Sequence, residues 1–554
     1  MPSNGTSFNL MRRPWIPATM LDGTRRMLSI RETIDLSPTI RSIDGDMPLQ
    51  RFALVRLLIS VLYGTFGHDF TVDQWRNLFD RGPADPTVQQ VIHGYCEDWE
   101  DRFDLFDDEA PFYQVAGLHT AKHEVFGLER LILDVPSGEP FFTTRSGDGL
   151  TSVDAAEAAR WLVTVQAYDA SGIKSGAVGD PRVKGGKGYP IGVAWTGHLG
   201  GLLVEGATLW QTLMLNFVGA DVLDASDSDV KWDEDAPAWE RPVYTACAAE
   251  GFDQVAERVA ETSFFHGPAT LLTWQSRRIL LAHHGETVTG VLVCNGDRLK
   301  PQNAQAYEMM TGWRRSPAQE KTLKHPLVYM PRKHDPSRAL WRGLPTLTVE
   351  TQTSDSSEAS AALRPYSLRW LSTVCANRPI PVRLHAFGVE YGNNDAVIDA
   401  TVDDVLDLNL VVLTSRNPQM GKMLQEAVNN VDQGVIALRA FAANLALAAG
   451  LPTDQPRQQA GELGYAAFDS AFRQWVRGID GDGSLAALRS QWNRIAKRLL
   501  VRLGMQLTEQ APVRAIVGRV VATPSGSPQH YSAALAEIWY RGKLNSIFPD
   551  QKGQ

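Results

Sequence analysis

Apolar side chains recur at two different spacings in the first part of the chain. From Pro48 to Gly64 they repeat every three or four residues, which predicts a core helix that begins at Pro48. A second helical pattern covers residues 154–168. Residues 279–281 and 288–293 are short runs of apolar, largely β-branched residues, a pattern that is typical of strands. This part of the chain is therefore expected to mix helices with sheet.

Beyond residue 404 the pattern becomes almost wholly helical. Four apolar stripes at helical spacing begin at Met420, Phe468, Leu485 and Leu535, with glycine and proline turn signals between them. Four amphipathic helices joined by short turns are typical of a bundle. The sequence thus predicts an α+β protein, with a large mixed α/β N-terminal domain over residues 1–403 and a C-terminal four-helix bundle over residues 404–554.

One short segment before that boundary has the features of a hairpin. Residues 382–391 and 396–400 are extended in character, and Gly392-Asn393-Asn394-Asp395 lies between them. Glycine and asparagine tolerate a positive φ, so this segment is predicted to form the tip of a β-hairpin. The acidic pair Asp403-Asp404 is expected just ahead of a helix, where carboxylates favour the helix dipole.

Composition narrows the class of protein. With 44% hydrophobic and 21% charged residues among 554, the chain has the makeup of a folded protein. Its 54 basic and 63 acidic residues give a net charge of −9, which excludes a uniformly basic nucleic-acid binder but leaves room for a local basic surface. The four cysteines form no C-x-x-C pair, and charged residues interrupt the longest apolar runs. We therefore expect a cytoplasmic protein with no membrane-spanning segment.

A glycine-rich loop over residues 171–188 is the first candidate for chemistry. It is net basic, but Ile173 and Tyr168 stand where a phosphate-binding P-loop needs glycines. Without Cβ atoms its backbone amides can still approach a phosphate or the floor of a nucleic-acid groove. A flexible, solvated surface loop is an equally good interpretation. Its glycines are Gly172, Gly176, Gly179, Gly185, Gly186 and Gly188.

Other motifs point less clearly to a function. Residues 311–343 carry a surplus of Lys and Arg with interleaved aromatics, which suits either nucleic-acid binding or a solvated charged surface. His119 and His123 have a spacing that can bind a metal on a helix, although a surface pair is the commoner case. No G-x-S-x-G motif or other catalytic set is present, so no enzyme activity, metal or cofactor is expected. The alternative is a stand-alone, metal-dependent enzyme that processes nucleic acid through its acidic clusters.

Several blocks of residues together resemble one known family. They are Phe8 to Pro17 (FNLMRRPWIP), Phe103 to Phe106 with Pro111-Phe112, Thr273 to Arg278 (TWQSRR), Ala339 to Arg342, and Tyr391 to Asn394, in this order. The set resembles the CasA family, the large subunits of type I-E CRISPR Cascade surveillance complexes. The helical C-terminal region resembles that family's four-helix bundle in layout.

The resemblance implies a non-catalytic subunit that recognises the protospacer-adjacent motif (PAM) in double-stranded DNA. Recognition would occur through the minor groove, whose base edges are degenerate, so that guide pairing supplies most of the sequence discrimination. The subunit would also promote duplex opening and R-loop formation and recruit the helicase-nuclease. The implied partners are the other Cascade subunits, the CRISPR guide RNA, the target DNA and the helicase-nuclease.

The resemblance also implies site residues, by position and motif. The DNA-binding loop would be Ala170, Ser171, Gly172, Ile173, Lys174, Ser175 and Gly176. A hairpin made by Asn393, Asn394, Asp395 and Ala396 would enter the duplex, and Asp395 stands where the resemblance leads one to expect a glutamine. Lys300 is the candidate for a lysine that reaches the minor groove. The guide RNA would be held by Phe142, Thr143 and Thr144.

Overall fold

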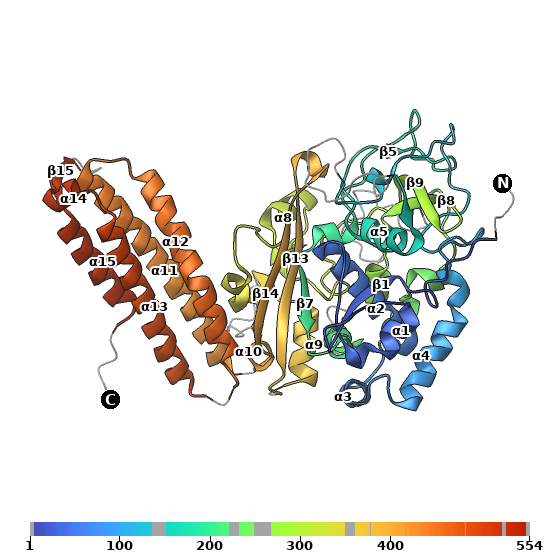
Figure 1. Cartoon of the computed structure of the whole chain (residues 1–554), viewed down its shortest axis with the longest axis horizontal. Coiled ribbons are helices and arrows are strands. Elements are labelled where there is room, and N and C mark those ends of the chain that lie inside the picture. The colour runs from blue at the N-terminus through green and yellow to red at the C-terminus, as the bar shows by residue number, and fades with distance from the viewer. Residues whose placement is uncertain are drawn as a thin grey trace. The chain divides into compact units, whose positions relative to one another are not determined.

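The computed structural model describes most of the chain as two compact units (Figure 1). The first unit comprises Met1–Arg338, Ser354–Ala376 and Val382–Val405, and the second comprises Ala339–Thr353, Asn377–Pro381 and Leu406–Gln554. Helix and sheet are mixed in the first unit and long helices dominate the second, which confirms the α+β class. The described residues are 5–135, 151–220, 232–248, 267–348, 361–376, 378–415, 417–481, 483–522 and 528–549.

Small sheets, rather than one large sheet, organise the first unit within the described ranges. Strands β8 and β9 confirm the two strands expected near residues 280 and 290, and β13 with β14 confirms the expected hairpin. In the order of pairing, the sheets are β2 (Arg25–Leu28), β1 (Ile16–Met20) and β3 (Ile40–Ile43); β11 (Tyr329–Pro331), β10 (Trp313–Arg315) and β12 (Ala362–Leu363); β14 (Ile398–Asn409), β13 (Pro381–Tyr391) and β7 (Gly201–Glu205); and β4 (Val153–Asp154), β9 (Thr287–Asn295), β5 (Lys174–Ser175) and β6 (Lys187–Gly188), with β8 (Arg277–His284) also paired to β9.

Two helices of the first unit form where the apolar spacing predicts them. Helix α2 begins at Pro48, where the missing backbone N–H costs nothing, and most of its side chains are buried. Helix α5 begins after Asp154, whose carboxylate accepts a hydrogen bond from the Glu157 amide. The helices are α1 (Ile30–Asp35), α2 (Pro48–Phe66), α3 (Val72–Arg81), α4 (Pro86–Asp98), α5 (Ala155–Tyr168), α6 (Leu209–Asn216), α7 (Pro268–Leu272), α8 (Pro317–Leu323) and α9 (Tyr366–Val374).

The second unit is a bundle in which α11 packs against three other long helices. Phe468, Phe472 and Trp492 from the predicted stripes are buried there. The β15–β16 hairpin was not predicted. The elements are α10 (Val411–Thr414), α11 (Pro418–Ala449), α12 (Asp454–Arg477), α13 (Leu485–Glu509), α14 (Arg514–Val517), β15 (Arg519–Ala522), β16 (Pro528–Tyr531) and α15 (Ala533–Ile547).

Helices α2 and α11 are long and apolar enough to cross a membrane when judged by length and composition alone. Within the folded chain, however, 78% of the most apolar window of α2 and 61% of that of α11 is buried. Such burial is typical of core helices, whose apolar surface is covered by neighbouring elements.

The expectation that Asp403 and Asp404 lie just ahead of a helix is wrong. Asp403 and Asp404 lie inside strand β14, which continues to Asn409, and not ahead of a helix. Val402, Leu406 and Leu408 are buried and alternate with more exposed residues, which is the period of a strand. The acidic pair was misread because carboxylates suit an exposed strand face as well as a helix start.

Candidate nucleic-acid interface

The glycine-rich loop leaves the end of α5 at Tyr168 and returns through β5 and β6. Gly172 has a φ of +143°, and a Cβ atom built on it would meet nothing within 4 Å. The neighbouring Ile173 side chain is 58% exposed. The backbone at Gly172 is therefore open to solvent and accessible to a ligand. Strand β5 is held in place by β6 on one side and by Cys294 of β9 on the other.

The β13–β14 hairpin ends in a tight turn. Its φ angles are +56° at Asn394 and +55° at Asp395, so two consecutive residues are left-handed. Gly392 has a φ of −72°, so the expected positive φ occurs at an asparagine but not at this glycine. The Gly392 amide donates to the Val397 carbonyl at 2.9 Å and closes the turn.

The loop and the hairpin meet, although they come from different halves of the chain. The Ser171 amide donates a hydrogen bond to the Asp395 carbonyl at 2.8 Å. Just behind this contact, the Tyr391 hydroxyl donates to the Tyr168 carbonyl at 2.7 Å. These four residues are called the loop–hairpin junction below. The two segments implied by the family resemblance thus form one continuous surface feature of the first unit.

Lys174 supports the loop from behind. Its Nζ lies 2.6 Å from Asp169 Oδ2, and its side chain is only 17% exposed. Burial lowers the pKa of Lys174, and the Asp169 carboxylate offsets part of that effect. Burial alone would raise the pKa of Asp169, but Lys174 and Arg277 together hold it below its ordinary value. In this arrangement the Lys174 ammonium neutralises an internal carboxylate.

Arg277 organises the same region from β8. Its Nε donates to the Asp169 carboxylate, and its Nη2 donates to the carbonyls of Ala170 at 3.1 Å and Gly192 at 2.9 Å. Only 1% of the side chain is exposed. A buried guanidinium that uses several donors on main-chain oxygens fixes the path of the loop. Arg277 was part of a family-like block, but nothing in the spacing of residues suggested this role.

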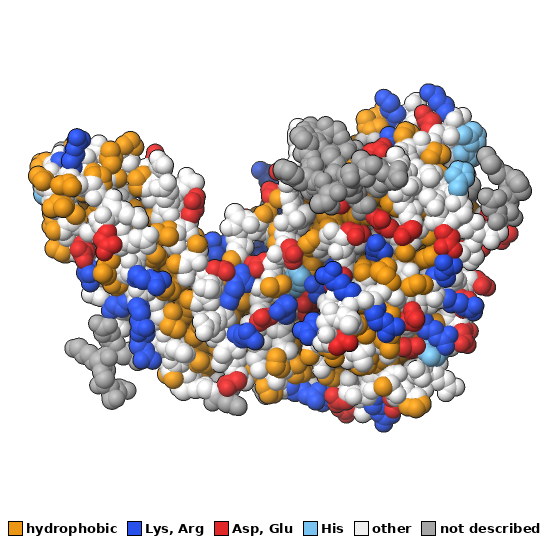
Figure 2. Space-filling model, in the orientation of Figure 1, with side chains coloured by type: hydrophobic (Ala, Val, Ile, Leu, Met, Phe, Trp, Pro, Cys, Tyr) orange, Lys and Arg blue, Asp and Glu red, His pale blue; other side chains and the backbone are white. Residues whose placement is uncertain are grey.

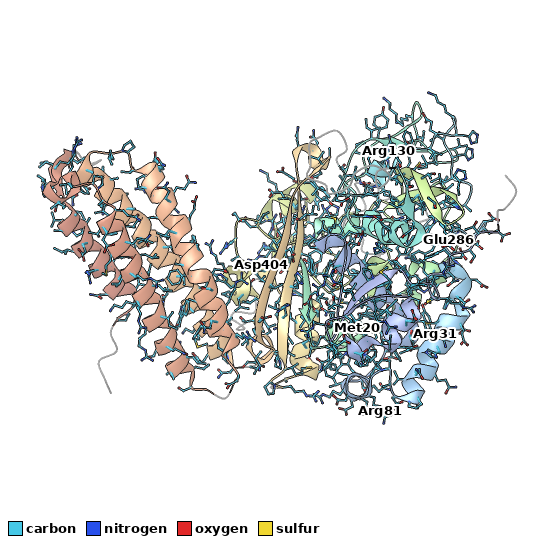
Figure 3. The ribbon with its side chains drawn as sticks, viewed as in Figure 1. Met20, Arg31, Arg81, Arg130, Glu286 and Asp404 are labelled. Carbon is cyan, nitrogen blue, oxygen red and sulfur yellow. The ribbon has the colours of Figure 1, made fainter. Side chains whose placement is uncertain are left out.

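Arg130 anchors strand β5 from the side. Its Nη1 donates to Ser175 Oγ at 3.1 Å, and its guanidinium carbon lies 3.4 Å from the centre of the Phe126 ring. Figure 3 labels Arg130 in the region where Figure 1 labels β5. A guanidinium stacked on an aromatic ring is held in a defined orientation, so Ser175 has a stable partner.

A lysine, Lys333, lies beside the loop–hairpin junction, although its position in the sequence did not link it to this site. Lys333 Nζ lies 5.4 Å from the centre of the Tyr391 ring. Burial lowers the pKa of Lys333, while the negative charges of Asp395 and Glu390 oppose that shift. Lys333 belongs to the basic stretch of residues 311–343, and the local surplus of charge was the available signal. Elsewhere on the face of the first unit shown in Figure 2, basic and acidic side chains are interspersed.

The structure places Lys300 but does not describe the residues that were expected to hold the guide RNA. Lys300 lies five residues beyond the end of β9, and its pKa is lowered by burial and by the neighbouring Arg298. Lys300 is not a partner in the Ser171–Asp395 or the Tyr391–Tyr168 hydrogen bond. Phe142, Thr143 and Thr144 lie outside the described residues.

The histidine pair does not form a helical face, which was the less favoured of its two interpretations. His119 and His123 lie in a turn, where His123 has a φ of +53°, and their rings stack with centres 4.7 Å apart. In the part of the chain that the structure describes, no group of three or more His, Cys, Asp or Glu side chains is arranged to hold a metal ion.

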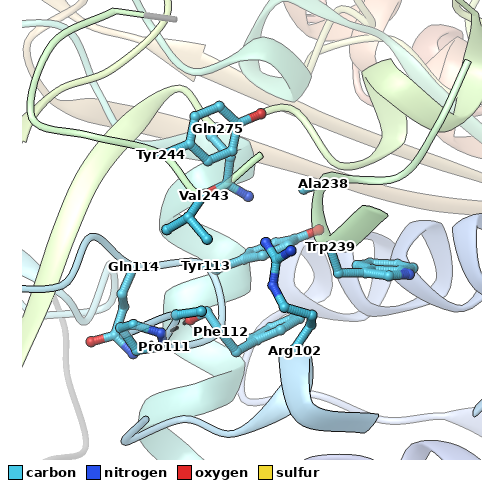
Figure 4. A pocket seen from close by; sticks show the side chains of 11 residues that line it. Arg102, Pro111, Phe112, Tyr113, Gln114, Ala238, Trp239, Val243, Tyr244 and Gln275 are labelled. Carbon is cyan, nitrogen blue, oxygen red and sulfur yellow. Dashed lines mark hydrogen bonds between the residues drawn. The ribbon is translucent and has the colours of Figure 1, made fainter. Parts of the chain in front are cut away.

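A cavity beside the family-like TWQSRR block is too small for an organic ligand. Its volume is about 30 Å³, enough for one or two water molecules. Arg102, Phe112, Tyr113, Tyr244 and Gln275 are among the side chains around it (Figure 4). The loop–hairpin junction therefore remains the better candidate for a functional site.

Comparison with known proteins gives consistent matches along the chain. A family model described as CRISPR-associated protein Cse1 matches residues 9–503. The crystal structure of Cse1 from Thermobifida fusca is 41% identical, with a TM-score of 0.87 and 99% of each chain covered. CasA/Cse1 from Thermus thermophilus is 29% identical over 292 residues, 51% of this chain and 50% of that protein, so the match spans about half the length of this curated relative.

A more distant structure is described as a CRISPR RNA-guided surveillance complex. The matching chain is 16% identical, with a TM-score of 0.64, and the match covers 98% of this chain and 100% of that one. At this level of identity the likeness establishes a common fold.

Proposed function

The chain belongs to the CRISPR-associated protein Cse1 family, and on that premise we propose that it is the non-catalytic large subunit of a type I-E CRISPR Cascade surveillance complex. In this proposal it recognises the PAM in double-stranded DNA through the minor groove and promotes duplex opening and R-loop formation. It also recruits the helicase-nuclease. Its partners are the other Cascade subunits, the CRISPR guide RNA and the target DNA, and it acts in the cytoplasm.

The observation that carries the proposal is the hydrogen bond from the Ser171 amide to the Asp395 carbonyl at 2.8 Å. It places an open glycine backbone beside a tight hairpin tip, so one element can approach the groove floor while the other enters the base stack. Backbone contacts suit the minor groove, because its degenerate edges offer little for side chains to discriminate. A hairpin pressed between base pairs costs a few kcal/mol of unstacking, which heteroduplex formation and backbone contacts offset.

Lys333 supports the proposal electrostatically. An acidic tip residue such as Asp395 is unfavourable beside DNA phosphates, but Lys333 is close enough to influence the same junction and carries the opposite charge. The cation therefore compensates the Asp395 carboxylate locally. Arg332, the preceding residue, adds a second basic side chain to this stretch of sequence.

The proposal is tested by Gly172→Val in the assembled complex. A branched side chain at a φ of +143° is strained, so the loop must change its path although the surrounding space is open. We expect PAM-dependent duplex binding to weaken by about tenfold, which corresponds to about 1.4 kcal/mol, while guide-RNA loading stays intact. Binding is measured by mobility-shift titration of duplexes with and without a PAM.

Gly285→Val is a matched control for backbone strain. Gly285 also has a positive φ, of +57°, with nothing within 4 Å of a built Cβ, but it lies in the β8–β9 turn. This variant should keep normal PAM-dependent binding. A second test variant shortens the hairpin by removing Asn393 to Ala396 and should also weaken binding. Unchanged binding in both test variants would refute the assignment of the site.

A further inference from the structure

The glycine-rich loop contains a second tight turn beyond strand β5, which Figure 1 labels. Gly185 and Gly186 have φ angles of +59° and +73°. On either side of them, the backbones of Lys184 and Lys187 exchange two hydrogen bonds, at 3.1 and 3.2 Å. Two consecutive left-handed residues within such a pair are typical of a type I′ turn, which both glycines adopt without strain. The turn thus fixes the two lysines directly opposite each other.

Lys187 is also paired with strand β5 on its other side. It lies opposite Ser175, while Lys184 forms an antiparallel bridge with it. Residues that lie opposite each other on neighbouring strands direct their side chains to the same face. Ser175, Lys187 and Lys184 therefore follow one another across a single face, with neighbouring Cα atoms about 4.5–5.5 Å apart.

Arg130 extends this line of side chains at its β5 end. Its Nη1 donates to Ser175 Oγ at 3.1 Å, so the guanidinium lies on the face to which the Ser175 side chain points. The stacking of Arg130 on Phe126 keeps the guanidinium in place. Arg130, Lys187 and Lys184 are called the cation row below.

The cation row is not neutralised by carboxylates of the described residues. None of its three members forms an ion pair with them. Asp180, the acidic residue nearest to the two lysines in sequence, is paired with Arg182 through both carboxylate oxygens, at 2.9 and 3.0 Å. The carboxylate of Glu129, which precedes the arginine of the row, lies against Gly127. The positive charge of the row is therefore available to a ligand.

The two lysines of the row repel each other when no anion is bound. Lys184 and Lys187 are exposed, and like charges directly opposite each other on neighbouring strands are destabilising. An anion between the two ammonium groups replaces this repulsion with two attractions. A nucleic-acid strand carries one negative charge per 3.4 Å of its axis, so a line of cations about 5 Å apart can bind successive phosphates.

We propose that the cation row binds the phosphate backbone of the target duplex beside the PAM. This inference rests on the proposed function, which places duplex DNA at Gly172. Gly172 precedes Ser175 by three residues, so their Cα atoms are at most about 11 Å apart. The minor groove is only about 6 Å wide, so a duplex whose groove meets Gly172 has backbone phosphates within reach of long basic side chains. The row supplies affinity and orientation and reads no base sequence.

The test measures duplex binding by the assembled complex at several salt concentrations. The double variant Lys184→Gln/Lys187→Gln removes two phosphate contacts and keeps the glycines that form the turn. We expect the slope of log K against log salt concentration to become shallower by about 2. Affinity at low salt should fall by about tenfold for duplexes with and without a PAM alike, because phosphate contacts carry no sequence information.

Two further variants separate the effect of charge from that of structure. Lys184→Arg/Lys187→Arg keeps both positive charges and should keep the salt slope of the unchanged complex. Arg25→Gln/Arg26→Gln removes the same net charge from exposed positions on β2 and should also leave the slope unchanged. An unchanged slope in the double glutamine variant of the row, an equal loss in the β2 control, or a loss of guide-RNA loading would overturn the proposal.

Comparison with Gly172→Val shows which of the two proposals fails. Gly172→Val should lose PAM preference, whereas the double glutamine variant of the row should keep it. Normal binding in the row variant beside weakened binding in Gly172→Val would overturn only the phosphate contact. A shallower slope in the row variant beside unchanged binding in Gly172→Val would count against the glycine loop as the PAM site and support the row as a DNA contact.

Discussion

Replacing Tyr391 with Phe removes one oxygen atom from the loop–hairpin junction. The hydroxyl donates to the Tyr168 carbonyl at 2.7 Å, and the side chain is 8% exposed. Burial raises the pKa of Tyr391 well above its usual value, so the hydroxyl remains a donor throughout the neutral pH range. The substitution therefore deletes a hydrogen bond that is present under all assay conditions, and it retains the aromatic ring beneath Lys333.

The size of the effect follows from the chemistry of the bond. A buried neutral hydrogen bond contributes about 1 kcal/mol net, and a carbonyl left without a donor can raise the loss to about 1–3 kcal/mol. If this free energy opposes local opening of the junction, a loss of about 1.4 kcal/mol makes opening about tenfold more frequent. The Ser171 amide, which bonds to Asp395, reports such opening directly.

Hydrogen exchange measured by mass spectrometry tests this reasoning. In Tyr391→Phe, peptides that contain Ser171 should lose about tenfold in protection, and PAM-dependent duplex binding by the assembled complex should weaken in parallel. Tyr540→Phe is the matched control, because Tyr540 is also buried and donates to the Leu500 carbonyl at 2.8 Å in the second unit. Unchanged protection at Ser171 in Tyr391→Phe, or the same loss in the control, would refute the role given to Tyr391.

Further predictions concern the core and the cysteines. Arg56 and Glu308 form a bidentate ion pair at 2.9 and 2.8 Å, with 2% and 1% of their side chains exposed. Arg56→Met should therefore lower the free energy of unfolding by about 3–5 kcal/mol, which a strongly lowered melting temperature would show. Burial alone would raise the pKa of Glu308, but Arg56 and its hydrogen bonds lower it below the ordinary 4.5. The contribution of the Glu308 carboxylate to the free energy of unfolding is therefore fully present above pH 4.5 and is lost as the pH falls through its lower pKa in the folded state. Glu308→Gln should remove this dependence, so the melting temperature of the variant should fall less steeply between neutral and acidic pH. Burial raises the pKa of Cys96 and of Cys294 to about 12, so both remain unreactive thiols at neutral pH. Brief alkylation of the native chain at neutral pH, followed by mass spectrometry, should find the partly exposed Cys247 labelled first. Rapid labelling of Cys96 would contradict this.

Helices with a long periodic pattern of apolar residues could be predicted from the sequence. Helices α2 and α5 and the four long helices of the second unit follow from apolar spacing, because burying one face or the whole helix imposes that spacing locally. Short motifs were less informative. The spacing of His119 and His123 suggested a helix, but the chain turns there. Two residues at a fixed separation do not determine backbone geometry when the residues around them carry no periodic pattern.

The linear chain already specified an open glycine loop, a tight hairpin and a local excess of basic residues, since each depends on the chemistry of a few neighbouring positions. Folding alone established that Ser171 touches Asp395, that Lys174 neutralises Asp169 and that Lys333 stands over Tyr391. The first and the last of these contacts join residues far apart in the chain, whereas Lys174 and Asp169 are only five positions apart. The free energies of all three depend on distance and burial, which residue spacing does not encode.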